Sequence, residues 1–179
     1  MFEIKAWISD YLDEISTITV KAFDKDWYNV SGYVQVDIGE HQIGYFPMRP
    51  AMPGQTGDEW VNWWLESFLQ CANKISETKY VAFPMPESNL TWLEFELVDT
   101  RVIFNLAEYG GCELKGLIIT EKFNGFTYVE PLGVEIEYAD FLKEIKRASM
   151  SFFNELESIN PSLMNSKMAI DMLHLFDLL

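Results

Sequence analysis

Two carboxylates on one strand-like segment are the side chains that could most directly perform chemistry. Glu94 and Glu96 alternate with Leu93 and Phe95, so an extended backbone places both carboxylates on one face, about 7 Å apart. A carboxylate pair at this separation can act as acid and base in glycoside hydrolysis. Catalytic pairs usually come from different elements, so the pattern favours a solvated outer face over a reaction centre.

Two further groups combine carboxylates with a histidine, which are side chains that bind metal ions. One lies at an expected turn and one along a helical line: Asp37, Glu40 and His41, and Asp171, His174 and Asp177. A turn and a hydrated helix face explain both groups without a metal. The sequence also has no glycine-rich phosphate loop, nucleophile elbow or paired-cysteine motif. We therefore expect no cofactor, no metal and no enzymatic activity.

Three tryptophans lie close together in the middle of the chain. Trp60, Trp63 and Trp64 begin an apolar stripe at spacings of three and four that continues through Phe68. Such rings could stack on a sugar or a base, but tryptophans on a helical stripe usually belong to the core. The interpretation is a core helix over 58–77.

The chain is strongly acidic. It has 28 Asp and Glu against 13 Lys and Arg, a net charge of −15 at pH 7. Between residues 80 and 114, Arg101 alone opposes six acidic side chains: Glu87, Glu94, Glu96, Asp99, Glu108 and Glu113. This charge repels nucleic acid and anionic membrane surfaces and favours a basic partner. The alternative is that it only keeps a small protein in solution.

The composition also indicates the compartment. The first residues lack a basic start followed by an apolar run, and no stretch of about 18 apolar residues occurs. Cys71 and Cys112 read as ordinary thiols in a reducing compartment. We expect a cytoplasmic protein without a membrane span.

Most of the chain before residue 138 has the alternation typical of strands. The expected strands are 2–8, 18–23, 30–38, 43–47, 80–83, 91–97, 101–107, 114–120 and 126–130. Residues 39–42 predict a hairpin turn, and the proline- and glycine-rich residues 47–58 predict a loop. Thr56 and Glu59 match a capping box at the start of the central helix.

From residue 138 the period becomes helical, and Asn160-Pro161 separates one helix from a second over 163–179. The second helix has two apolar faces, of which one docks on the core. The other packs on the same core, on a partner, or on a second copy of the chain, which would make a homo-oligomer. The predicted fold class is α+β in a single domain, 1–179. A curved antiparallel sheet of about seven or eight strands packs against the central helix and the C-terminal helices.

A small, acidic, single-domain chain with an N-terminal β-meander resembles the bacterial immunity proteins that neutralise polymorphic toxins. The resemblance includes the closing helix at residues 138–145, which reads YADFLKEI. It implies a stoichiometric inhibitor that covers the basic active site of a toxin domain, often a nuclease, inside the producing cell. It transfers no individual residue, because these families share a role more than a motif.

An acidic surface with aromatic anchors is the binding surface that such a role needs. The predicted partner-binding residues are Trp92, Glu94, Glu96, Asp99, Glu108, Tyr109 and Glu113. Two alternatives stay open. One is a small-molecule-binding domain or carboxylate-dependent enzyme, with a pocket between the sheet and the Trp60 helix that the 47–58 loop would gate. The other is a subunit that associates with itself through the terminal helix.

Overall fold

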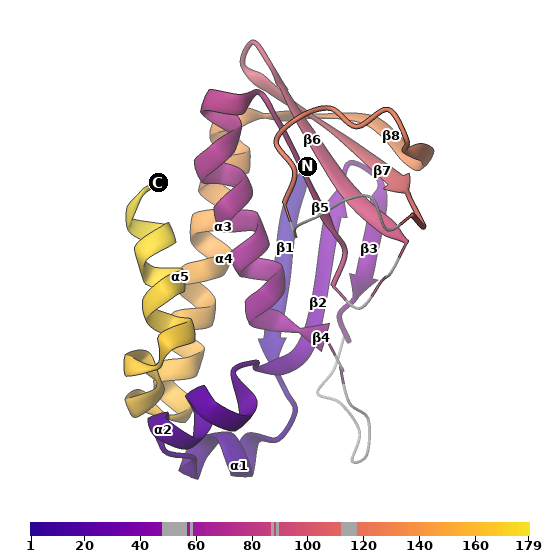
Figure 1. The fold of residues 1–179 in the computed structure, drawn as a ribbon. Coiled ribbons are helices and arrows are strands. Elements are labelled where there is room, and N and C mark those ends of the chain that lie inside the picture. Colours follow the sequence, from indigo (N-terminus) through magenta and orange to yellow (C-terminus); the bar gives the residue numbers. More distant parts are fainter. Residues whose placement is uncertain (48–56, 58, 87, 89, 112–117) are drawn as a thin grey trace.

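The computed structural model describes residues 1–47, 57, 59–86, 88, 90–111 and 118–179. In this part of the chain the fold is α+β, as the sequence predicts, but the strands form two antiparallel sheets of four (Figure 1). The predicted single sheet of seven or eight strands is therefore wrong. The central helix separates the strands of the first sheet from those of the second along the chain, and no described strand pairs across the two sheets.

The first sheet is built around its second strand. Its members are β1 (Phe2–Ile8), β2 (Ser31–Ile38), β3 (His41–Tyr45) and β4 (Glu59–Trp60). β1 pairs along one edge of β2, whereas β3 and β4 follow one another along the other edge. Gly39, with φ of 63°, lies in the turn between β2 and β3, so the predicted hairpin is confirmed.

The second sheet is a meander in chain order. Its members are β5 (Tyr80–Pro84), β6 (Thr91–Val98), β7 (Arg101–Glu108) and β8 (Thr127–Glu137). The first three match the predicted strands, while β8 continues well beyond the predicted end at residue 130. Most of the strand predicted over 114–120 lies outside the described residues, although Ile119 forms an isolated bridge with Ala82.

The strand predicted over 18–23 is wrong, because this stretch is helical. It follows α1 (Leu12–Thr17) and contains α2 (Val20–Ala22) and the first residue of the π-helix η1 (Phe23–Trp27). The Thr19 hydroxyl accepts a hydrogen bond from the Ala22 N–H at 3.3 Å, which caps the start of α2. The strand-like alternation spans only six residues, and the helical start that the Thr19 cap stabilises prevails over it.

The longer helices agree with the predicted periods. They are α3 (Val61–Thr78), α4 (Tyr138–Ile159) and α5 (Lys167–Asp177), with a short 3₁₀ helix, η2 (Pro161–Asn165), before the last. The predicted capping box is wrong, because α3 begins two residues after Glu59 and has no side-chain cap. The Glu59 carboxylate instead accepts a hydrogen bond from Trp64 Nε1 at 2.7 Å, and Thr56 lies outside the described residues.

The core joins both sheets to α3 and α4. Phe68 of α3 contacts Phe2 of the first sheet and Phe83 and Phe95 of the second, with ring centroids 5.3–6.0 Å apart. Phe95 in turn lies 5.4 Å from Phe141 of α4. In Figure 1 the helices stand on one side of the sheets, and α5 lies against α3 and α4.

The terminal helix α5 docks by one face, as predicted. Met168 and Met172 are fully buried in the core, and Leu173 and Phe176 pack partly against it. Ile170 is mostly exposed. Self-association through this helix stays a prediction. Among the described residues, no helix combines the length and the apolar character needed to cross a membrane.

Side chains from α4 protect the free edge of β1. The Ile4 N–H donates to Glu144 Oε1 at 2.7 Å, and Arg147 Nη2 donates to the Ile4 carbonyl at 2.6 Å. The Ile8 N–H donates to Glu155 Oε1 at 3.2 Å. An edge strand with free backbone groups can pair with other chains, so these contacts also block that pairing.

Glu155 is predicted to make stability depend on pH. Burial raises its pKa from the ordinary 4.5 to about 7, against the opposing hydrogen bond from Ile8. Between these pH values the folded protein holds a proton that the unfolded chain releases, so the contribution of Glu155 to stability falls as the pH rises. Glu155→Gln should therefore raise the free energy of unfolding by about 1 kcal/mol at pH 8, allowing for solvent screening, and by less at pH 5.

Urea denaturation at both pH values measures this effect. Glu157→Gln, at an exposed position of the same helix, is the control and should change little at either pH. A Glu155→Gln protein less stable than the parent at pH 8 would contradict the assignment.

Candidate functional site

Trp92 and Glu94 do not lie on an exposed face. They are only 7% and 0% exposed, because residues 118–126 cover this face of the second sheet. The Trp92 ring lies 5.5 Å from the Phe126 ring in a small second core. The expectation of a solvated outer face is therefore wrong for these two residues.

Hydrogen bonds within the second sheet hold the Glu94 carboxylate in place. Its carboxylate accepts hydrogen bonds from Asn105 Nδ2 at 2.8 Å and from the Tyr128 hydroxyl at 2.9 Å, which connects β6, β7 and β8. Glu96 on the same face is partly exposed and forms an ion pair with Lys122 at 2.8 Å. The two carboxylates thus differ in burial and in partners, although they are two residues apart.

The other predicted residues do not complete one surface. Asp99 is exposed in the turn that precedes β7, and Glu108 is exposed at the far end of β7, about 24 Å away along the eight-residue strand. Tyr109 packs edge-on against Phe123, with centroids 4.7 Å apart. Glu113 lies outside the described residues. The structure therefore separates the exposed acids instead of gathering them around an aromatic anchor.

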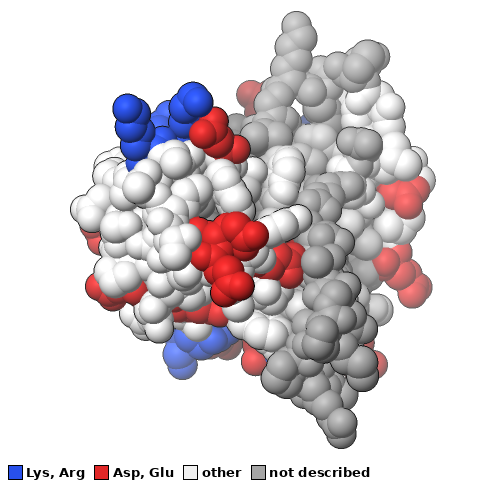
Figure 2. All heavy atoms as spheres, turned by 90° about the horizontal axis from the view of Figure 1, so that it is seen from below, with Lys and Arg blue, Asp and Glu red and all other residues white. Residues whose placement is uncertain are grey.

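A different surface does combine aromatic rings with carboxylates. It is a hollow of about 450 Å³ where α1 and η1 meet β4, and we call it the aromatic–acidic surface. Its lining is Tyr11, Glu14, Asp26, Trp27, Asn29, Ser31 and Trp60. Figure 2, which views the end of the molecule that carries α1 and α2, shows acidic groups set among uncharged surface.

The rings of this surface are accessible to a partner. Tyr11 is 55% exposed and Trp60 is 37% exposed, and the Tyr11 and Trp27 rings meet edge-on at 5.7 Å. Glu14 and Asp26 are exposed beside them. Asp26 has an ion pair with Lys25 at 3.3 Å, and such an exposed pair contributes little to stability.

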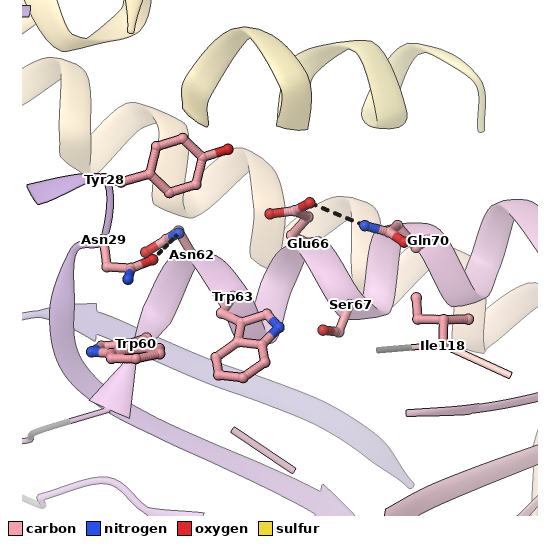
Figure 3. Close-up of a pocket in the computed structure, with 9 residues that line it drawn as sticks. All are labelled: Tyr28, Asn29, Trp60, Asn62, Trp63, Glu66, Ser67, Gln70 and Ile118. Carbon is pink, nitrogen blue, oxygen red and sulfur yellow. Dashed lines mark hydrogen bonds between the residues drawn. The ribbon is translucent and has the colours of Figure 1, made fainter. Parts of the chain in front are cut away.

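A second hollow adjoins the first at Asn29 and Trp60. We call it the α3 pocket. It has a volume of about 360 Å³ and is lined by Tyr28, Asn29, Trp60, Asn62, Trp63, Glu66, Ser67, Gln70 and Ile118 (Figure 3). Core aromatics fill the space between α3 and the sheets, so the α3 pocket opens on the flank of the helix. Most of the 47–58 loop that is expected to gate a pocket beside this helix lies outside the described residues.

The prediction that all three tryptophans belong to the core is right only for Trp64, which is fully buried. Trp60 and Trp63 line the α3 pocket, with ring centroids 5.3 Å apart. The sequence contains a signal for this difference. The helical line through Trp63 continues to Ser67 and Gln70, which are polar, whereas the line through Trp64 continues to apolar residues.

Buried polar contacts fix the geometry between the two hollows. Asn62 is buried, and its Oδ1 accepts the Val30 N–H at 2.8 Å while its Nδ2 donates to Asn29 Oδ1 at 3.1 Å. Tyr11 and Tyr28 have positive φ values of 54° and 60°. Left-handed non-glycine residues cost about 1 kcal/mol or more and cluster at functional sites, as π-helices such as η1 often do.

The α3 pocket is negatively charged. Burial raises the pKa of Glu66, against a hydrogen bond from Gln70, and the nearby charge of Asp171 raises it further. Burial also raises the pKa of Tyr28, to which the charges of Glu66 and Asp171 add. No Lys or Arg in the described part of the chain forms an ion pair with either carboxylate. The pocket is therefore suited to a positively charged group.

The candidate metal ligands of the sequence analysis lie in separate places. In the ranges that the structure describes, no three His, Cys, Asp or Glu side chains converge as a metal site. Asp171, His174 and Asp177 are exposed on α5, and Asp37 is paired with Lys5 at 2.6 Å. Cys71 is buried in α3, where burial raises the pKa of its thiol, and Cys112 lies outside the described residues.

Comparison with known proteins adds no family. No family model matches the chain, and no curated protein or solved structure gives a significant match. Function is therefore inferred from the geometry and charge of the two hollows.

The contrast between Glu94 and Glu96 is testable. Glu94→Lys should lower the free energy of unfolding by at least about 3 kcal/mol, because it places an unpaired cation in a fully buried site. Glu96→Lys, the matched change on the same face, should cost no more than about 1 kcal/mol. Urea denaturation of both variants measures the difference, and equal losses would contradict the burial of Glu94.

Proposed function

We propose that the chain is an acidic protein-binding module that binds a basic protein through the aromatic–acidic surface. The observation that carries this proposal is the placement of exposed Tyr11 and Trp60 beside Glu14 and Asp26. Tyr and Trp are enriched among the few residues that carry most of the affinity in protein interfaces, and surrounding carboxylates accelerate the encounter with a basic partner.

The partner that we favour is a basic bacterial toxin domain, and a nuclease domain is one such toxin. The module would neutralise it by stoichiometric binding, as immunity proteins do. The net charge of −15 supports this choice, because a protein that binds nucleic acid offers a basic surface to an acidic inhibitor. Glu96, Asp99 and Glu108 would contribute to the long-range field without touching the partner.

The preorganised surface also supports protein binding. Asn62 ties α3 to the residues before β2, and the segment between β1 and β2 packs on the core through Ile15 and Phe23. Side chains that are held in place before binding lose less conformational entropy when a partner arrives. A rigid surface of this kind suits tight stoichiometric inhibition.

A second candidate function is the binding of a small molecule in the α3 pocket. The observation that favours it is the pocket itself, whose volume and mixed aromatic and polar lining are typical of ligand sites. A carboxylate-dependent enzyme has less support, because Glu66 is the one acidic residue among those that line the pocket.

A charge-reversal pair tests the proposed surface. The double variant Glu14→Lys/Asp26→Lys should slow association with the partner at least tenfold at low salt and flatten the salt dependence, because it removes the local negative field. The partner used is the basic protein that co-purifies with the wild-type chain from its source cells as a one-to-one complex. Surface plasmon resonance at several salt concentrations gives the rates.

The matched control is Glu40→Lys/Glu157→Lys, which changes the net charge equally at exposed positions on β2–β3 and α4. It should slow association much less. Trp60→Ala should mainly speed dissociation, because it removes a contact formed in the complex. Equal slowing by both double variants would show that total charge, not this surface, drives binding, and the proposed site would be wrong.

A further inference from the structure

The α3 pocket has a polar wall. Ser67 lies on this wall, and its side chain is only 5% exposed. Figure 3 shows this hydroxyl between Trp63 and Ile118 on the wall of the pocket. A hydroxyl group on a pocket wall can donate to and accept from a polar group that enters.

The same wall has acceptor capacity for a cation. Gln70 Nε2 donates to Glu66 Oε1 at 3.0 Å. Glu66 Oε2 has no hydrogen-bond partner among the described residues, and the Gln70 carbonyl oxygen takes no part in this bond. Asp171 lies near enough to add its charge to Glu66 and Tyr28. A cation placed here would gain hydrogen bonds and relieve the repulsion between the two carboxylates.

The two indole rings that line the pocket favour a planar cation. The Trp60 and Trp63 rings lie 5.3 Å apart at an interplanar angle of 32°, and together they form an aromatic wall. A guanidinium group stacks on indole rings and presents five donors in a fixed plane, whereas an ammonium group is a compact charge with stronger hydration. Carboxylate, hydroxyl and amide acceptors beside indole rings match the guanidinium better.

We propose that the α3 pocket binds the guanidinium group of an arginine side chain that projects from the basic partner. This inference rests on the proposed function, because it gives the aromatic–acidic surface a specific subsite. The two hollows share Asn29 and Trp60, so a protein bound on the surface can insert a side chain into the pocket. Glu66 pairs with the guanidinium, Ser67 and Gln70 accept from it, and Trp63 stacks on it.

A minimal probe tests this subsite without the partner. N-acetyl-arginine methylamide should bind saturably in the millimolar range and shift the indole N–H signals of Trp60 and Trp63 in ¹⁵N NMR spectra. N-acetyl-citrulline methylamide, which has nearly the same shape without the charge, should bind at least tenfold more weakly. The blocked lysine should also bind more weakly than the blocked arginine.

Variants locate the binding. Glu66→Gln should weaken the arginine probe at least fivefold, and Ser67→Ala should weaken it about twofold. Glu77→Gln, at an exposed position of the same helix, should leave the affinity unchanged. Absence of saturable binding, equal binding of the citrulline probe, or an unchanged affinity in Glu66→Gln would each overturn the inference.

The outcome of the arginine-probe experiment can be distinguished from the outcome of the charge-reversal test of the proposed function. If the arginine probe binds as described but Glu14→Lys/Asp26→Lys does not affect association with the partner, the subsite is real and the proposed surface is wrong. If the double variant slows association and the probe does not bind, the surface is right and the subsite is wrong.

Benzamidine, a free amidinium compound, tests whether the pocket binds a small cationic molecule instead of a partner side chain. Benzamidine binding more than a hundredfold tighter than the arginine probe would indicate a small-molecule site and overturn the assignment to a partner side chain.

Discussion

Phe68 is the point at which the two sheets and the helices meet. Each sheet has four strands in the described part of the chain, and a small sheet is stable only when a hydrophobic face is covered. The Phe68 ring contacts Phe2 in one sheet and Phe83 and Phe95 in the other, and Phe95 extends the cluster to α4. A fully buried Phe contributes about 1.5–3 kcal/mol, so this shared cluster provides the main reason for the two sheets to fold as one body.

The packing of α3 in this cluster explains the position of the candidate site. One side of the helix is taken by the core, so Trp60 and Trp63 lie on its flank beside the residues before β2. Asn62 satisfies the Val30 N–H at this junction and so fixes the start of the helix against β2. The rings are thus held by the same helix that organises the core, which gives the surface its rigidity.

The acidic side chains have several different roles. Glu144 and Glu155 satisfy backbone groups of β1, and Glu94 is buried between three strands of the second sheet. These carboxylates act within the fold, whereas Glu14 and Asp26 face outward next to aromatic rings. The net charge therefore overstates the acidic surface that a partner can reach, and it says little about where that surface lies.

The residue pattern alone predicts the fold class, the long helices and most strands, because periods of 3.6 and 2 follow from backbone geometry over a few turns or residues. It also determined the sign of the surface charge. It did not determine the helical form of residues 18–23, where a short alternating run competed with the Thr19 cap. Contacts between distant segments set the division into two sheets, the burial of Trp92 and Glu94 under residues 118–126, and the meeting of Tyr11, Trp27 and Trp60. A residue pattern records which side of an element is apolar, whereas burial and convergence depend on which distant segments come to cover that side.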